Sequence, residues 1–432
     1  MTDIGRASTV RWRADTGKAS TVRWRIFAII FVLVVINLID RVTLSIAMPT
    51  IAKEFALEPA FQGLILSAFF WSYALLQIPG GWLIDRFGPR ALITGAAVGW
   101  GFFQAIAGIA TGGVTLLLSR VGLGAAEAPL FPAGAKLNSL WLSPRERARG
   151  AVLVDSGAPL GAAFGGVIIS SLILSLGSWR TAFVVAGVAT MALGALAWWY
   201  LRDHPAKHSG VNAAELAAIQ ASSASDKAVS DDRSRSVSTR SMAAIVLGRI
   251  SWAMINFGLL TWGPSYLAQA RGFGLKQMGG ATFVIFFGGM FGSLASGFLA
   301  DKLQDLGYSR AAVYKGALGV TGLGVMLAFL ALPQVADPIA AVALLSATLF
   351  LLYFGSLYWS LPAILASKDK VGVVGGVMNF AGSSSGIAVP IITGLILQAT
   401  GTYLMVLYFF AGCAALYVVG SLLIDFRQAE VR

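Results

Sequence analysis

Twelve long apolar runs dominate this sequence and leave it few ways to fold. Each run is about 20 residues or longer, the length that an α-helix needs to cross the hydrocarbon core of a bilayer. Only 12% of the 432 residues are charged, whereas soluble domains carry about a quarter. The sequence therefore predicts an all-α integral membrane protein with twelve transmembrane helices, at residues 26–52, 61–84, 91–111, 114–138, 150–175, 181–201, 242–267, 279–300, 311–333, 339–365, 371–398 and 402–424.

Two polar stretches divide the chain into two halves. We interpret residues 1–25 as a disordered cytoplasmic tail held at an anionic membrane surface, and they carry the segment ASTVRWR twice. Residues 203–240 separate six spans from six, as a cytoplasmic linker would, and Ala213–Gln220 is expected to form a short amphipathic helix there. We therefore expect an N-terminal six-helix bundle at 26–202 and a C-terminal bundle with a short tail at 241–432.

The two halves also resemble each other in sequence. GWLIDRFGPR follows the second span and GFLADKLQDLG follows the eighth, so that Asp85 and Asp301 lie half a chain apart. Two repeated bundles are typical of carriers that expose a central site to each side in turn. Glycine-rich stretches at 157–166 and 288–297 are expected to let helix backbones approach closely.

The net charge of +12 is distributed as membrane topology predicts. Of the 32 Lys and Arg side chains, four fall in loops on the side away from the N-terminus and three inside spans; the rest lie on the N-terminal side. This bias predicts that both termini lie in the cytoplasm. We expect no nucleic-acid partner and, with a single cysteine, Cys413, no disulfide within the chain. We also expect no metal site, no cofactor and no enzyme active site.

Four ionisable residues lie inside apolar spans, where a charge costs several kcal/mol by lenient estimates. Asp40 and Arg41 are in the first span, Arg120 and Glu127 in the fourth. Helix rise places Asp40 and Arg120 at similar depth. We therefore predict that these two pair and that Arg41 remains available for a substrate anion; the alternative is a purely structural ion pair.

Glu127 has no charged neighbour at helical spacing except Arg120, so we predict an unpaired carboxyl that binds and releases a proton. A hydrogen-bonded structural carboxyl is the alternative. Pro129 and Pro132 are expected to bend the helix just after it.

Two further groups are candidates for conformational roles. Asp155 and Arg249 could meet as a gate near the cytoplasmic side, or could extend separately toward the interface. Asp85, beside Arg86 and Arg90, is placed to form a charge latch with a neighbouring helix end. His204 and His208 are interpreted as solvated linker residues.

The sequence resembles the major facilitator superfamily and, within it, the anion:cation symporters that include galactonate- and glucarate-type sugar-acid:proton symporters. The matching segments begin at Leu38 (LIDRVTLSIAMPTIA), Ser67 (SAFFWSYALLQIPGGWLIDRFG) and Arg120 (RVGLGAAEAPLFPA), and in the second half at Leu260 and Gly375. The signature loop matches at Gly81, Asp85, Arg86, Gly88 and Arg90. The resemblance implies two six-helix bundles, alternating access and a location in the bacterial inner membrane.

The resemblance also implies roles for single residues. Asp40 and Glu127 would handle protons, and Arg41 and Arg120 would bind the anion. Tyr73 and Asn379 would hydrogen-bond the substrate, with Tyr353 and Trp359 as weaker candidates. Sugar-acid permeases often carry a polar residue where this chain has Ala158, and Arg249 is unusual, so both residues bear on whether the substrate is a hexonate.

The leading hypothesis is a monomeric carrier that imports a small organic anion together with protons. A hexonate or hexarate is the first expectation. An aromatic carboxylate is the alternative, because the region of the site carries the aromatic residues Phe69, Phe70, Trp71 and Trp359. A cation extruder is disfavoured by the buried arginines. A membrane sensor or scaffold would need an output domain that residues 203–240 are too short to provide.

Overall fold

A computed structural model describes residues 19–225, 237–366 and 370–426, and over these ranges the chain is helical, with twelve helices long and apolar enough to span a membrane. The predicted all-α class and number of spans are confirmed. Proline begins several helices and glycine in the left-handed conformation ends three, at Gly177, Gly272 and Gly401. The α-helices are α1 Val22–Glu54, α2 Pro59–Phe87, α3 Pro89–Gly108, α4 Gly113–Glu127, α5 Leu130–Trp141, α6 Pro144–Leu176, α7 Trp179–Tyr200, α8 Ala213–Ser225, α9 Thr239–Arg271, α10 Leu275–Asp305, α11 Arg310–Ala331, α12 Pro338–Leu352, α13 Leu361–Leu365, α14 Val371–Thr400 and α15 Leu404–Leu422.

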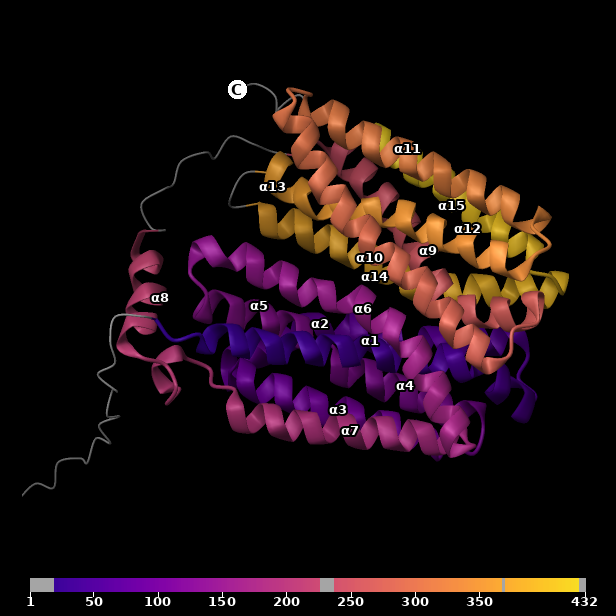
Figure 1. Cartoon of the computed structure of the whole chain (residues 1–432), viewed down its shortest axis with the longest axis horizontal. Helices are drawn as coiled ribbons and strands as arrows, with labels where there is room; N and C mark the ends of the chain where they lie inside the picture. The colour runs from indigo at the N-terminus through magenta and orange to yellow at the C-terminus, as the bar shows by residue number, and fades with distance from the viewer. Residues whose placement is uncertain (1–18, 226–236, 367–369, 427–432) are drawn as a thin grey trace, which may run out of the picture.

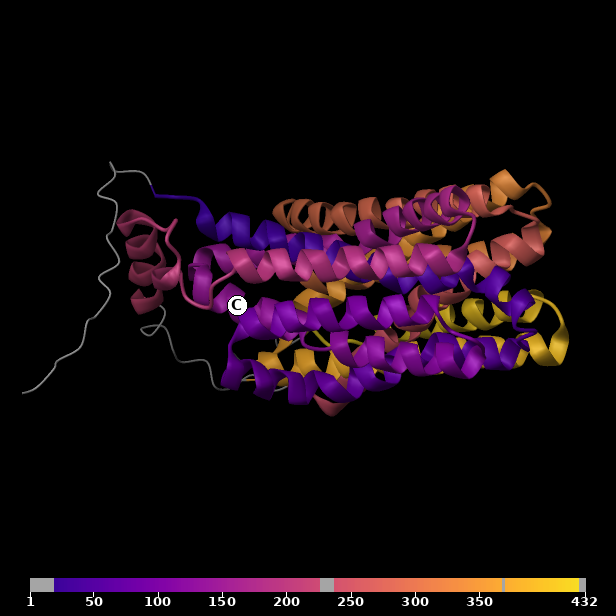
Figure 2. The same cartoon turned by 90° about the horizontal axis from the view of Figure 1, so that it is seen from below.

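The helices form two groups that lie side by side, α1–α7 and α9–α15 (Figure 1). The groups meet mainly where α2 packs on α14, α6 on α10 and α1 on α9. Helix α8 lies across one end of the molecule in both views (Figure 2). We call this end, where the described chain begins and ends, the terminal side, and the opposite end the far side. The exact domain boundaries remain predictions.

The glycine-rich stretches bring backbones together, as predicted. A Cβ atom added at Gly161 of α6 would collide with the Val35 carbonyl of α1, and one at Gly292 of α10 with the Phe350 carbonyl of α12. Gly166 and Gly279 make an equally close approach between the two bundles. A side chain at these positions would push the helices apart.

Two spans are interrupted along their length. The fourth span breaks after α4, where Ala128 and Pro129 leave the helix before α5 begins, so the predicted bend is confirmed. The tenth span, predicted as continuous, passes from α12 into a 3-10 segment, η4 (Tyr353–Ser360), before α13. Eight residues is long for a 3-10 helix, which usually ends after one turn.

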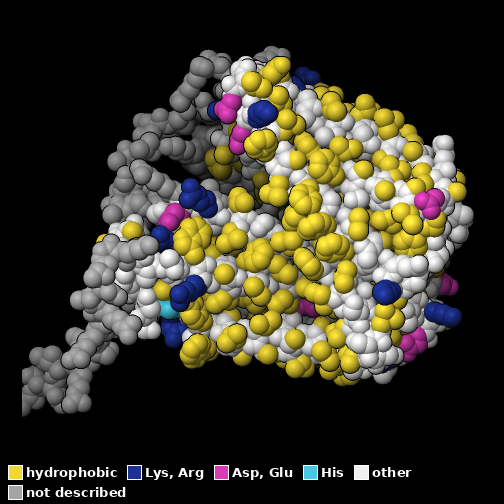
Figure 3. Space-filling model, viewed as in Figure 1, with side chains coloured by type: hydrophobic (Ala, Val, Ile, Leu, Met, Phe, Trp, Pro, Cys, Tyr) yellow, Lys and Arg dark blue, Asp and Glu magenta, His cyan; other side chains and the backbone are white. Residues whose placement is uncertain are grey.

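The two bundles close on the far side and separate toward the terminal side. On the far side, a Cβ atom at Gly63 of α2 would clash with the Pro390 carbonyl of α14, and Gln398 bonds to Ala60 and Glu58. Nearer the terminal side, a Cβ at Gly376 would meet no atom within 4 Å. The space-filling view shows a hollow there between the two halves, within a surface that is largely apolar (Figure 3).

The second ASTVRWR copy is part of the fold, which corrects the prediction of a disordered tail for its residues. Helix α1 begins at Val22, and the fully buried Glu215 of α8 accepts hydrogen bonds from the backbone N–H groups of Val22 and Arg23. The Arg23 side chain also bridges Glu215 and Glu146 at 3.3 and 3.1 Å. These contacts tie α8, confirmed as a helix, to the start of α1. The first copy lies outside the described residues.

His208 is not fully solvated, which corrects that prediction, whereas His204 is exposed. The His208 ring packs edge-on against Trp141 and Tyr200, with centroids 5.9 and 5.0 Å away. This burial, together with the charge of Arg202, lowers the pKa of His208.

Candidate functional site

The four buried ionisable residues come together in the N-terminal bundle, but not in the predicted pairs. Arg41 Nε lies 3.1 Å from Glu127 Oε2, and the Glu127 side chain is fully buried. The predictions that Arg41 is available and that Glu127 is unpaired are therefore wrong for this conformation. The pairing differs from the prediction because of the direction of the two side chains. Residues 40 and 41 point about 100° apart around the helix axis, and Arg41 is the one that faces α4.

Asp40 faces away from this pair, toward α3 and α7. Its carboxylate accepts a hydrogen bond from Thr190 Oγ1 at 3.4 Å, lies beside Trp100 and forms no ion pair among the described residues. Arg120 is close enough to act on Asp40 through its charge. The predicted Asp40–Arg120 pair is thus replaced by a looser arrangement in which two cations and two carboxyls share one buried region.

A small cavity lies beside these charges, between the two bundles. Its lining comes from α1, α2, α4 and α9: Arg41, Ser45, Leu66, Phe69, Phe70, Arg120, Leu260 and Thr261. Its free space is roughly that of one water molecule. Arg41 Nη2, Arg120 Nε and Ser45 Oγ are buried and have no hydrogen-bond partner among the described residues. Three unsatisfied donors around one cavity are what an anion's oxygen atoms would complete.

Aromatic rings support the guanidinium groups. Arg41 Cζ lies 4.5 Å from the centre of the Phe69 ring and 4.6 Å from that of Tyr73. Phe69 and Tyr73 stack on each other, and Phe69 also supports Arg120. The structure therefore places Tyr73 at the site, touching Arg41 through its ring face. On the other side, Phe70 packs against Phe257 of the second bundle at 4.9 Å.

The remaining predicted substrate residues lie nearer the terminal side. The half-buried Asn379 of α14 donates to Gln77 Oε1 of α2 at 3.4 Å, which joins the two bundles. Trp359 packs over the Arg249 guanidinium, and Tyr353 packs edge-on against Trp252. None of these residues lines the cavity beside Arg41.

The signature loop forms contacts within the first bundle. Asp85 binds Lys136 of α5 at 3.0 Å, so its partner is a helix of the same bundle. Arg90 donates to the Trp198 carbonyl and stacks on the Trp198 ring, and Arg86 lies over Trp82. Gly88 adopts a positive φ of 84°.

The other candidates for conformational roles are less constrained. A Cβ at Gly81 would meet nothing within 4 Å, and Asp301 is exposed. The Asp155 side chain lies outside the described residues, so its pairing with Arg249 remains a prediction.

Sequence reasoning missed several polar residues around the charges. Asn37 of α1 lies beside Glu127 of α4. The amide atoms of Asn37 are buried and have no hydrogen-bond partner among the described residues. The same holds for Gln104, one helical turn beyond Trp100 on α3. A polar residue one turn before Asp40 was the available signal for Asn37. No signal in the sequence indicated a role for Thr190, because isolated threonines are ordinary in membrane helices.

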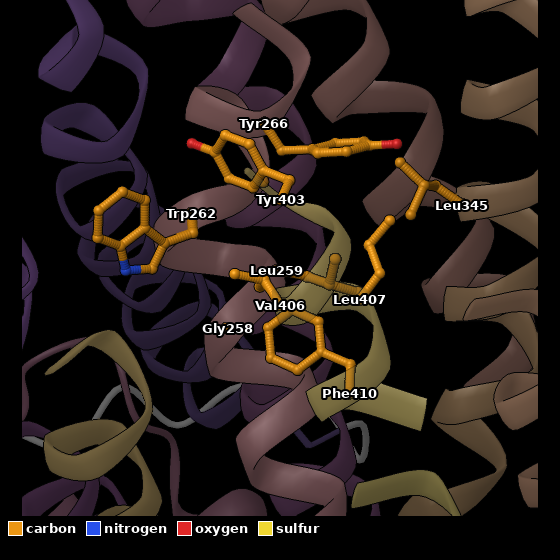
Figure 4. Close-up of a pocket in the computed structure, with 10 residues that line it drawn as sticks. Gly258, Leu259, Trp262, Tyr266, Leu345, Tyr403, Val406, Leu407 and Phe410 are labelled. Carbon is orange, nitrogen blue, oxygen red and sulfur yellow. The ribbon is translucent and has the colours of Figure 1, made fainter. Parts of the chain in front are cut away.

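A second cavity lies inside the C-terminal bundle and has a different character (Figure 4). Tyr266 and Tyr403 line one end, and Leu259, Val406 and Phe410 line the rest. Its ten lining residues include no charged side chain, so it does not match an anion.

Fold and site together define a twelve-span carrier with a charged cavity between two bundles. The sequence matches the profile of the Major Facilitator Superfamily over residues 30–390, and the chain belongs to that superfamily. It is a multi-pass membrane transporter and not an enzyme.

Comparison with individual proteins gives the same result. The chain is 32% identical to the D-galactonate transporter of Escherichia coli O6:H1 (86% of this chain, 88% of the relative). It is 34% identical to a probable sulfoacetate transporter of Cupriavidus necator (84% and 85%). Among solved structures it resembles a bacterial homologue of the human lysosomal transporter Spinster in an inward-facing, occupied conformation, with a TM-score of 0.71 at 18% identity (94% and 95%). That likeness concerns the fold alone.

Proposed function

We propose that this protein imports a small organic anion together with protons by alternating access. The observation that carries the proposal is the cavity between the bundles, where Arg41, Arg120 and Ser45 present buried donors that have no hydrogen-bond partner in the part of the chain that the structure describes. Arginine donors match the oxygen atoms of a carboxylate or sulfonate, and such bonds are strong in a dry site.

The Arg41–Glu127 ion pair provides a route to coupling. An anion that binds Arg41 must compete with Glu127 for the same guanidinium. A proton on Glu127 removes that competitor, so proton and anion each favour binding of the other. The charge count supports this, because two cations and two carboxylates sum to zero and a bound anion needs a proton to restore neutrality. Asp40 is the second proton site in this scheme.

The sidedness follows from the basic residues on the terminal side. The positive-inside bias makes that side cytoplasmic, in the bacterial inner membrane, so protons entering down their gradient would carry the anion inward. We propose that the carrier works as a monomer.

The acid group is the feature shared by the substrates named for the relatives. A sugar acid such as galactonate or glucarate is the first candidate, and smaller acids such as sulfoacetate fit the same arginines. The cavity is also lined by Phe69 and Phe70, which favours an aromatic carboxylate as the second candidate.

Uptake into proteoliposomes with an acidic exterior tests the proposal. Labelled D-galactonate, D-glucarate, sulfoacetate and benzoate are compared, with wild-type protein and with Asp40→Asn and Glu127→Gln. We expect concentrative uptake of at least one acid by wild type and none by either variant. The proposal would be contradicted if wild type accumulated substrate equally with and without the pH gradient. It would also be contradicted if both variants accumulated substrate as wild type does.

A further inference from the structure

Three buried polar side chains near the charged residues have no role in the coupling scheme. Asn37 of α1 and Trp100 and Gln104 of α3 are each at most 1% exposed. Both amide atoms of Asn37, both of Gln104 and the indole Nε1 of Trp100 have no hydrogen-bond partner among the described residues. Buried polar groups are almost always paired, either with protein groups or with ordered water. These five atoms therefore need partners that the neighbouring side chains do not supply.

Asn37 lies between the two buried carboxyls. It precedes Asp40 by three residues and Arg41 by four, so it shares a helix face with each of them, one turn nearer the terminal side. Its amide lies beside Glu127 of α4. Arg41 holds the Oε2 atom of Glu127, whereas Oε1 is buried and has no hydrogen-bond partner within the described ranges. One carboxylate oxygen of Glu127 is thus left for a partner in the region of Asn37.

Helix α3 brings the other two polar side chains to the depth of these carboxyls. A Cβ atom added at Gly99 would lie 3.2 Å from the Ala126 Cβ of α4, so the two helices are in contact there. The next residues along each helix, Trp100 and Glu127, are therefore within about 3 Å of the same depth by helix rise. Gln104 follows Trp100 on the same face of α3, about 6 Å nearer the far side.

This polar region is separate from the cargo cavity. The cavity lies between α1, α2, α4 and α9, and neither Asp40 nor Glu127 lines it. Asp40 instead faces α3 and α7, where Trp100 lies beside it. Arg41 and Arg120 are the cations whose charge acts on the two carboxyls. A proton that moves from one carboxyl to the other while cargo fills the cavity therefore needs a polar route of its own.

We propose that Asn37, Trp100 and Gln104 hold buried water that joins Asp40 to Glu127 and carries a proton between them outside the cargo cavity. Buried water forms two to four hydrogen bonds, which amide and indole groups supply. The O–H bond of protonated Asp40 breaks as its proton passes to a water oxygen, and that water gives a different proton to Glu127 Oε1. Asp40 is left as a carboxylate, Glu127 becomes neutral and the water is unchanged. The inference rests on the proposed function, since it takes both carboxyls to be proton sites.

Radiolytic labelling tests for the water without any transport. Pulsed X-rays convert bound water into hydroxyl radicals, which oxidise the side chains that touch it even where bulk water is excluded. We expect Trp100 to be oxidised in wild type and roughly threefold less in Asn37→Leu, where the water has lost two of its partners. Trp141 is the matched control, because it is fully buried but its Nε1 donates to the Arg202 carbonyl. Labelling of Trp100 no greater than that of Trp141 would overturn the inference.

Comparing pH-driven uptake with exchange tests the relay, with labelled D-galactonate as the probe. Asn37→Leu should lower pH-driven uptake about tenfold but leave exchange within about twofold of wild type, since the cargo cavity is untouched. The remaining uptake should slow more in D2O than wild-type uptake does. Asn37→Ser, whose hydroxyl still binds water, should recover most of the uptake. Thr348→Val changes a buried hydroxyl in the C-terminal bundle that bonds to its own helix, and it should match wild type in both assays.

These transport assays distinguish a relay from a structural role of Asn37. An equal fall in uptake and exchange in Asn37→Leu, an unchanged sensitivity to D2O, or no recovery in Asn37→Ser would overturn the inference. If wild type carries no acid at all, the proposed function fails. If wild type transports but Trp100 is not labelled, only the relay fails.

Discussion

Arg41 and Glu127 form a buried ion pair at 3.1 Å between α1 and α4, beside a cavity where Arg41 Nη2, Arg120 Nε and Ser45 Oγ have no hydrogen-bond partner among the described residues. The pair occupies the group that would otherwise bind an anion. In the mechanism that we propose, the opening and closing of this pair decide when the cavity can accept cargo.

Glu127→Gln should separate exchange from accumulation. Glutamine resembles the protonated carboxyl, so Arg41 stays available while the proton site is lost. We expect exchange of internal for external substrate to persist and gradient-driven accumulation to fall to the equilibrium ratio. Counterflow and pH-driven uptake measure the two activities. Glu54→Gln, which changes a carboxyl bonded to Trp179 at the far side, should accumulate normally.

Tyr73 can be tested for ring and hydroxyl roles separately. Its ring face contacts Arg41, and a cation–π contact in a desolvated site contributes about 1–2 kcal/mol. Tyr73→Leu should therefore raise the KM about tenfold, whereas Tyr73→Phe should change it less than twofold. Equal defects in both variants would instead assign the role to the hydroxyl, as the family resemblance implies.

Gly63→Ala should shift the balance between conformations. The new Cβ would collide with the Pro390 carbonyl, a backbone atom that cannot rotate away, so closure of α2 on α14 at the far side becomes unfavourable. Spin labels on the far-side ends of α2 and α14 should report longer distances and uptake should slow. Gly95→Ala, where a Cβ meets nothing within 4 Å, is the matched control.

Glu215→Ala should destabilise the protein without touching the cavity. It removes the acceptor for two backbone N–H groups at the start of α1 and breaks the partly buried pair with Arg23. Loss of one partner of such a pair costs about 3 kcal/mol. Thermal melting in detergent should show a lower Tm, with a smaller loss for Glu215→Gln. An unchanged Tm would mean that α8 does not support α1.

His208 should make stability depend on pH. Burial holds its pKa below the unfolded value of about 6.5, so the unfolded chain binds the proton more readily. Stability is therefore unaffected well above that value and decreases as the pH falls through it. Melting at pH 7.5 and 5.5 should show a smaller acid-induced loss in His208→Gln than in wild type. A loss of the same size in both would assign it to other groups.

The sequence was sufficient to predict the spans and one bend, because both depend on local composition. Runs of apolar residues specify helices, and Pro129 cannot continue one. The pairing at the site was missed because helix rise gives depth but not direction, and Asp40 and Arg41 differ mainly in direction. The interruption of the tenth span was missed as well, since Tyr353–Ser360 contains no proline and its 3-10 geometry depends on neighbours. Among these, Trp252 donates to the Leu352 carbonyl at 2.6 Å.

The two interrupted spans have a mechanical consequence. Helices α4 and α12 are each the fourth span of their bundle, and each runs for 15 residues from the far side before the break. The two helix breaks lie at the same depth in their bundles. Each bundle can therefore bend at its break as well as turn as a rigid body. The far-side and terminal-side halves of the carrier need not move together. The entrance on one side can therefore close before the entrance on the other side opens.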